Sequence, residues 1–152
     1  MEPRIQYTRT PDGEPIAYWT LGDRPPFIHM GATTSHIQVE WDTRWIRTWY
    51  QRLARTRTVI RFDLPGMGLS QGGRHAPIVA GDFQEKIGVA IDCVADKLNE
   101  ECFDLVAPHV SSPAGISYAG RQPGRVRRLV LFRWDEKAGL QGGMQVHCSQ
   151  ES

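Results

Sequence analysis

The amino-acid sequence predicts an α/β fold with a mostly parallel sheet that carries helices on both faces. Short apolar runs alternate along the chain with segments whose apolar residues recur every three or four positions, as in amphipathic helices. Two of the runs, Phe27 to Met30 and Val126 to Phe132, are almost continuously apolar, which is typical of strands buried on both faces. A turn sequence, Pro11 to Glu14, separates the first two strand candidates and predicts an antiparallel hairpin.

The expected order is a hairpin, then strand, helix, strand, helix, strand, helix and strand, which gives about six strands in a three-layer α/β/α arrangement. The expected strands are Ile5 to Thr8, Pro15 to Leu21, Phe27 to Met30, Thr58 to Phe62, Phe103 to Ala107 and Val126 to Phe132. The expected helices are Thr43 to Arg55, Phe83 to Leu98 and Ser112 to Arg121. From Arg133 neither period continues, so we expect one domain, residues 1–133, and an irregular C-terminal tail, residues 134–152.

The composition is that of an ordinary globular protein, with 152 residues, 40% apolar and 23% charged. The net charge of +1 provides no long-range field, so neither nucleic acid nor a membrane is expected as a partner. No apolar run approaches the ~20 residues that a membrane span needs. The three cysteines form no CxxC motif and the first residues form no apolar leader, which together favour a cytoplasmic location with reduced thiols.

Four segments resemble the N-terminal half of the α/β-hydrolase family. Pro11 to Tyr18 resembles its opening hairpin, and Arg61 to Ser70 (RFDLPGMGLS) resembles its R-x-D-x-x-G-x-G-x-S turn. Phe103 to Val106 is similar to the strand before the nucleophile, and Tyr118 to Leu131 is similar to the YAxRxPxRVxRLVL stretch. The resemblance covers residues 5 to 132 and implies six strands in the spatial order 1-2-4-3-5-6.

The turn after Arg61 and Phe62 also has a physical reading that does not need the family. Gly66 and Gly68 are expected where the backbone turns sharply with positive φ. Asp63, at the end of a strand, is expected to accept hydrogen bonds from backbone amides of this turn. We therefore interpret the motif as structural.

The resemblance implies a nucleophile on a tight strand-to-helix turn (G-x-S-x-G), a later acid and histidine, and an oxyanion hole of backbone amides. Aligned backwards from Tyr118 without a gap, the five turn positions fall on Ala107 to Ser111. His109 then occupies the nucleophile position, and both glycines are replaced. Pro108 also removes an amide beside the turn. We interpret this stretch as a degenerate nucleophile turn that has become an ordinary loop, so no catalytic triad is intact.

An alternative is an unorthodox triad. Its members would be Ser111 or Ser112, with Asp135 and His147. Against it, either serine is more typical of an N-cap for the helix that follows, since Ser112 with Pro113 is a good pair of N-cap and first helical residue. The tail also offers nothing to hold His147.

The remaining features bear on ligands. Backbone amides for an oxyanion hole would come from Gly31, Ala32 and Val110. His29 lies in an apolar strand and is typical of a hydrogen-bonded core residue, while His75 lies in a polar loop. The sequence contains no metal-ligand spacing and no nucleotide-binding motif, so neither a metal nor a cofactor is expected.

Three functional hypotheses remain open. The first is a truncated α/β-hydrolase-family protein without catalysis, and the second is a small serine-type ester hydrolase. The third is a binding module that uses an exposed sheet edge. Val126 to Phe132 would be the last strand, and its unpaired outer edge would recruit a second copy or another chain. The substrate cannot be read from the sequence, because fold resemblance does not fix specificity.

Overall fold

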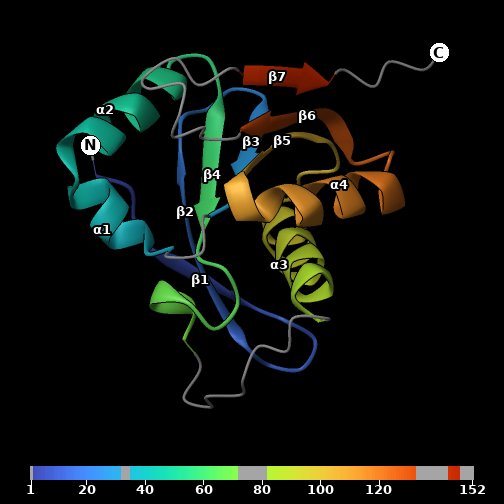
Figure 1. Cartoon of the computed structure of the whole chain (residues 1–152). Coiled ribbons are helices and arrows are strands. Elements are labelled where there is room, and N and C mark those ends of the chain that lie inside the picture. The colour runs from blue at the N-terminus through green and yellow to red at the C-terminus, as the bar shows by residue number, and fades with distance from the viewer. Residues whose placement is uncertain (1, 32–34, 72–81, 133–143, 148–152) are drawn as a thin grey trace.

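A seven-stranded sheet with the order β1-β2-β4-β3-β5-β6-β7 forms the centre of the molecule (Figure 1). The computed structural model describes residues 2–31, 35–71, 82–132 and 144–147. The strands are β1 (Gln6–Arg9), β2 (Pro15–Leu21), β3 (Pro26–His29), β4 (Thr58–Phe62), β5 (Phe103–Pro108), β6 (Val126–Phe132) and β7 (Met144–His147). The helices are α1 (Ile37–Asp42), α2 (Arg44–Leu53), α3 (Phe83–Lys97) and α4 (Ser112–Arg121), with 3-10 turns η1 (Gly68–Ser70) and η2 (His109–Ser111).

Strand pairing confirms the α/β class and the antiparallel N-terminal hairpin. β1 pairs antiparallel with β2, and β2 pairs antiparallel with β4. The four central strands β4, β3, β5 and β6 pair in parallel, and helices lie in the connections that lead from β3 to β4, from β4 to β5 and from β5 to β6. The order of the first six strands is the one that the resemblance implies.

The last strand, β7, corrects two expectations about the C-terminal residues. Met144–His147 pairs antiparallel with β6, and Val130 lies opposite Val146. The expectation of an irregular tail is therefore wrong for these four residues, and the outer edge of β6 is paired from Leu129 to Phe132. A strand edge presents a row of unsatisfied amides and carbonyls, and a short return strand of the same chain satisfies them. Residues 134–143 and 148–152 of the expected tail lie outside the described residues.

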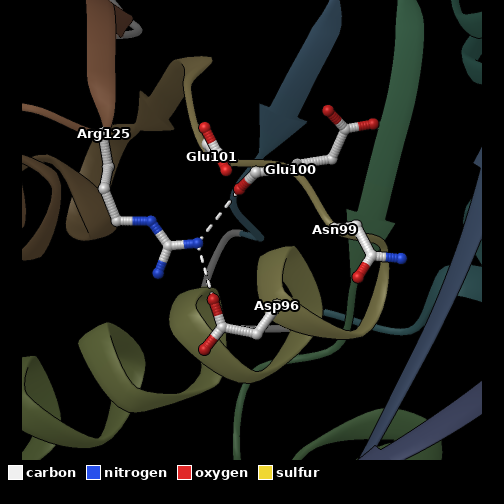
Figure 2. Close-up of a pocket in the computed structure, with 5 residues that line it drawn as sticks. All are labelled: Asp96, Asn99, Glu100, Glu101 and Arg125. Atoms are coloured by element: carbon white, nitrogen blue, oxygen red, sulfur yellow. Dashed lines mark hydrogen bonds and ion pairs between the residues drawn. The ribbon is translucent and has the colours of Figure 1, made fainter.

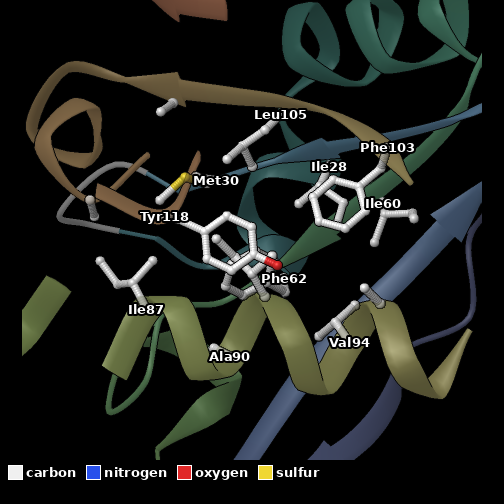
Figure 3. Packing of buried hydrophobic residues seen from close by; sticks show 14 of the residues in the cluster. Ile28, Met30, Ile60, Phe62, Ile87, Ala90, Val94, Phe103, Leu105 and Tyr118 are labelled. Atoms are coloured by element: carbon white, nitrogen blue, oxygen red, sulfur yellow. The ribbon is translucent and has the colours of Figure 1, made fainter. Parts of the chain in front are cut away.

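The two faces of the sheet carry different helices. Figure 1 shows α3 and α4 on one side and α1 and α2 on the other. Under α3 and α4 lies the larger core, in which Phe62, Leu105 and Tyr118 are almost completely buried (Figure 3). Ile87 and Val94, two turns apart on α3, point from the helix into this core and have no exposed surface, as the helical spacing predicts.

The smaller core lies under α1 and α2 and is aromatic. The Trp19 ring meets the Trp41 ring edge-on at a centroid distance of 5.8 Å and the Tyr50 ring at 4.9 Å. Edge-to-face contacts of this kind are the favoured geometry of aromatic pairs. Helix α1, which supplies Trp41, was not expected from the sequence. His36 precedes it as N-cap and accepts a hydrogen bond from the Val39 amide at 3.4 Å.

Gly115 lets α4 approach the sheet closely. A Cβ atom at this position would lie 2.5 Å from the Ala107 Cβ of β5, which real Cβ contacts essentially never show. Because the glycine removes this clash, α4 packs directly on β5 and begins immediately after it. This packing positions the turn between β5 and α4.

Candidate functional site

The turn between β5 and α4 is sharp and left-handed at His109. Its φ is +47°, a value that non-glycine residues adopt rarely. Pro108 before it is extended, and the 3-10 turn η2 then leads into α4. The interpretation of this stretch as an ordinary loop therefore needs correction, because the strand-to-helix turn keeps a strained apex. The His109 side chain is exposed there.

Both serines after the apex donate their hydroxyl protons to backbone carbonyls. Ser111 has no exposed surface, and its Oγ donates to the Gly31 carbonyl at the end of β3. Ser112 Oγ donates to the Ala107 carbonyl at 3.0 Å. Of the two serines expected as N-cap residues, Ser111 holds the N-cap position of α4, but its side chain makes no capping hydrogen bond. The two hydroxyls instead tie the turn to the adjacent strands.

Of the residues predicted to form the oxyanion hole, the structure describes Gly31 and Val110. Gly31 is buried at the end of β3, next to Met30, whose amide donates to the Val106 carbonyl of β5 at 2.9 Å. Val110 follows the apex, and its side chain is 48% exposed. Gly31 and the turn are thus neighbours, linked through Ser111.

Other residues of the sequence-based site are not brought to this turn. Ala32, His75 and Asp135 lie outside the described residues. His147 is in β7, opposite Leu129 of β6. The alternative triad stays a prediction, because its acid, Asp135, lies outside the described residues.

A buried ion pair near the end of β3 is the feature that sequence reasoning missed. Arg61 on β4 has no exposed surface and forms two hydrogen bonds to Glu40 of α1, at 2.8 and 2.5 Å. Tyr50 OH donates to the same carboxylate at 2.8 Å, and Arg61 Nη2 also donates to Ser35 Oγ at 3.0 Å. Burial would raise the pKa of Glu40, but Arg61 outweighs it and holds this pKa below its usual value.

Asp63 organises the turn after β4, as the sequence predicts. Its carboxylate accepts hydrogen bonds from Ser35 Oγ at 2.7 Å and from the Leu69 amide at 2.8 Å. Gly66 and Gly68 have φ values of +77° and +49°. A side chain at Gly68 would collide with the Asp63 carboxylate, so this glycine is required by both its backbone and its neighbour. The motif is structural here.

His29 is half-buried and packs against aromatic rings of α2. Its ring lies 5.2 Å from the Trp49 ring, and its Nδ1 is 3.4 Å from Tyr50 OH. Burial and the nearby Arg61 lower the pKa of His29 to about 3. The imidazole is therefore neutral near pH 7, and it is engaged with α2.

A described pocket lies at the other end of β5 from His109 (Figure 2). Its volume is about 390 Å³, and it is lined by Asp96, Asn99, Glu100, Glu101 and Arg125. Arg125 Nη2 donates to Asp96 Oδ1 at 2.7 Å and to the Glu100 carbonyl at 3.0 Å. The arginine is thereby neutralised within the pocket wall, and the lining residues include no nucleophile.

Two further features concern metals and membranes. Within the described residues, no group of three His, Cys, Asp or Glu side chains is arranged to hold a metal ion. None of the described helices combines the length and apolarity that crossing a membrane requires.

Comparison with known proteins finds similarity at the level of structure. No family model and no curated protein sequence matches this chain. A hydrolase from Pseudomonas aeruginosa superposes with a TM-score of 0.68 at 21% identity, covering 83% of this chain and 44% of that one. A loop variant of a haloalkane dehalogenase from Bradyrhizobium elkanii gives 0.67 at 21% identity, covering 84% and 39%. An epoxide hydrolase from Vigna radiata gives 0.67 at 17% identity, covering 86% and 39%.

These matches concern the fold, because identities near 20% leave the activity open. The chain spans about two fifths of the length of the solved structures it matches. The matches cover between 83% and 86% of this chain. The described part of the chain therefore has the α/β-hydrolase fold.

Proposed function

We propose that this chain is an α/β-hydrolase-family protein that does not, by itself, hydrolyse esters through a serine. One observation carries the proposal: the Ser111 hydroxyl is completely buried and donates its proton to the Gly31 carbonyl. A serine nucleophile must reach the substrate and pass that proton to a base. Ser111 is arranged for neither step.

The residues around Ser111 support the same conclusion. Ser112 donates its proton to the Ala107 carbonyl instead of to a histidine. His29 packs against Trp49 and Tyr50. The apex of the turn, where the fold exposes a side chain, is His109. Under this proposal, the hydrogen bonds of Ser111 and Ser112 hold the turn in its shape, and the turn does not catalyse ester hydrolysis.

Hydrolysis of p-nitrophenyl acetate tests this proposal. The wild-type chain is expected to release p-nitrophenolate no faster than an equal concentration of free imidazole, which controls for the exposed His109. The Ser111→Ala and His109→Ala variants are expected to match the wild type within twofold or fall to the buffer rate.

Serine-dependent turnover would contradict the proposal. If activity well above the imidazole rate survived His109→Ala but was lost in Ser111→Ala or Ser112→Ala, the chain would be a small ester hydrolase. The alternative triad with Asp135 and His147 would then gain support, and the alignment that places His109 at the nucleophile position would be wrong.

A second candidate function is self-association through the sheet edge. β7 is last in the strand order, and among the described strands it pairs only with β6. An edge of this kind can add a strand from a second copy or from another chain. The candidate interface for association is therefore the edge of β7 instead of the edge of β6.

A cytoplasmic location belongs to the proposal as well. Cys93 and Cys102 are both free thiols in the structure, and Cys102 is exposed. An exposed unpaired thiol suits a reducing compartment better than an oxidising one. Thiol labelling of the endogenous protein in intact and lysed cells would test the location.

A further inference from the structure

Helix α2 exposes two tryptophans, Trp45 and Trp49, and Trp49 also packs against the His29 ring of β3. The Trp45 side chain is 74% exposed and that of Trp49 is 40% exposed. Trp45, Trp49 and Arg52 follow one another at spacings of four and three residues, so they lie on one face of the helix. Tyr50 on the opposite face is buried. Figure 1 shows α2 at the outside of the molecule, on the other side of the sheet from α3 and α4.

The segment that carries these tryptophans is strongly basic. Residues 43–57 contain no Asp or Glu, and they contain five arginines, Arg44, Arg47, Arg52, Arg55 and Arg57. Since the whole chain has a net charge of +1, the rest carries −4. The expectation that no membrane is bound used only the total, which hides this local concentration of positive charge.

Three of the five arginines are exposed and unneutralised within the described part of the chain. Arg57 lies 3.8 Å from Asp104, and Arg47 Nη1 donates to the Trp41 carbonyl at 3.5 Å. Arg44, Arg52 and Arg55 are exposed, and no described carboxylate lies within 4.0 Å of their guanidinium groups. We name the surface formed by Trp45, Trp49 and these three arginines the α2 face.

We propose that the α2 face binds an anionic lipid surface. Indole rings favour the boundary between lipid headgroups and acyl chains, where the ring is buried and its N–H remains hydrated. Arginines beside them attract negatively charged headgroups. A helix with aromatic side chains and arginines directed outward can therefore lie in the plane of the membrane surface.

The geometry favours lipid over nucleic acid as the occupant. Proteins that stack single-stranded bases on aromatic rings hold the strand in a positively charged groove. Trp45 and Trp49 stand on the outer surface of a helix, and the described pocket is lined by acidic residues elsewhere. A lipid surface is broad and deformable, so it can meet such a convex face.

Co-sedimentation with lipid vesicles tests the proposal. The wild-type chain is expected to bind vesicles of equimolar phosphatidylcholine and phosphatidylglycerol at least about tenfold more tightly than vesicles of phosphatidylcholine alone. Raised salt should weaken the binding. Arg52→Ala is expected to lower the affinity about fivefold. Trp45→Ala, which removes a mostly exposed ring and so leaves the core intact, is expected to lower it about tenfold.

Helix α4 supplies matched control variants. Ile116 is 53% exposed and Arg121 is exposed, so Ile116→Ala and Arg121→Ala make comparable changes on the opposite side of the sheet. Both controls are expected to bind like the wild type. Circular dichroism of every variant should match the wild type, which separates lost binding from lost folding.

Several results would overturn the proposal. One is that the wild-type chain does not bind anionic vesicles at low salt, and another is that it binds both vesicle types equally. A third is that the Trp45→Ala, Arg52→Ala double variant binds as tightly as the wild type. A random single-stranded oligonucleotide that displaces the chain from vesicles at sub-stoichiometric amounts would assign the α2 face to nucleic acid. A dimer in solution that Trp45→Ala dissociates would assign it to a second copy.

Discussion

Arg61 shows how a single residue can join elements that are distant in sequence. Its guanidinium, fully buried on β4, meets the Glu40 carboxylate of α1 at 2.5 and 2.8 Å. The pair is separated by 21 residues, and the helix that carries Glu40 was not expected from the sequence. Sequence reasoning could place Asp63 and Gly68, because the Leu69 amide that binds Asp63 and the Asp63 carboxylate beside Gly68 belong to the same short turn. It could not find Glu40, because only the tertiary fold defines that partner.

We predict that Glu40→Gln destabilises the protein by about 3 kcal/mol, because it removes the charge of the carboxylate that the buried Arg61 guanidinium contacts directly. The control is Asp96→Asn, which removes the ion pair between Asp96 and Arg125. The Asp96 side chain is 69% exposed. Its expected cost is below about 1 kcal/mol. Urea unfolding measures both. Equal costs for the two variants would show that the Arg61 pair contributes no more than a surface pair.

A second prediction at the residue scale concerns pH and His29. Its pKa in the folded state is lowered to about 3 from 6.5, so between these values the unfolded state binds more protons than the folded state. Stability should therefore fall as pH decreases from 6.5 towards 3. His29→Gln should remove part of this loss, about 2 kcal/mol between about pH 7 and about pH 5.

The measurement is urea unfolding of both proteins across that range. The pKa of Glu40 is lowered in the folded state. Its contribution to stability is therefore lost only at a pH below the range in which the two proteins are compared for His29. If the difference in stability between the two proteins is the same at every pH, His29 does not retain a low pKa in the folded state.

At the scale of elements, the length of a helix or strand affects whether its periodicity can be recognised in the sequence. The helix expected at Thr43 to Arg55 is α2 (Arg44–Leu53), and the strand expected at Phe103 to Ala107 is β5. Periods of two or 3.6 residues need several repeats to stand out. Helix α1 has six residues and β7 has four, so neither could be recognised by its period. β1 and β3 are as short as β7, but the turn sequence after β1 and the continuous apolar run of β3 indicated them.

Hydrogen exchange tests whether β7 is paired as described. From Leu129 to Phe132 the amides of β6 point alternately to β5 and to β7, so both sets should exchange slowly over this part of the strand. Fast exchange of one alternating set in the wild type would show that β7 does not pair in solution.

Two proline variants sharpen this test. Adjacent residues of β7 point their amides to opposite sides, so only one of Gln145→Pro and Val146→Pro removes a hydrogen bond to β6. That variant is expected to raise exchange in the β6 amides that face β7. The other variant is the matched control and should leave them protected.

At the scale of the whole molecule, the order of six strands could be predicted because four separate segments resemble one fold in the right sequence order. The same alignment places His109 at the turn after β5, where the structure has the left-handed apex. What could not be predicted is the burial of the Ser111 hydroxyl. That burial depends on the Gly31 carbonyl, 80 residues away, and on how β3 ends beside β5.

The outer edge of β7 is the reason to expect that the protein associates with a second copy. Among the described strands, β7 offers one side to β6 and leaves the other available, and such an edge recruits a further strand. We expect a homodimer at micromolar concentration, measured by sedimentation velocity. Val146→Lys should give a monomer, because a charged side chain on an edge strand opposes edge-to-edge pairing. Val39→Lys, at a 57% exposed position on α1, is the control and should remain dimeric. A wild-type monomer throughout this range, or a dimer that Val146→Lys leaves intact, would show that β7 ends the sheet without a partner.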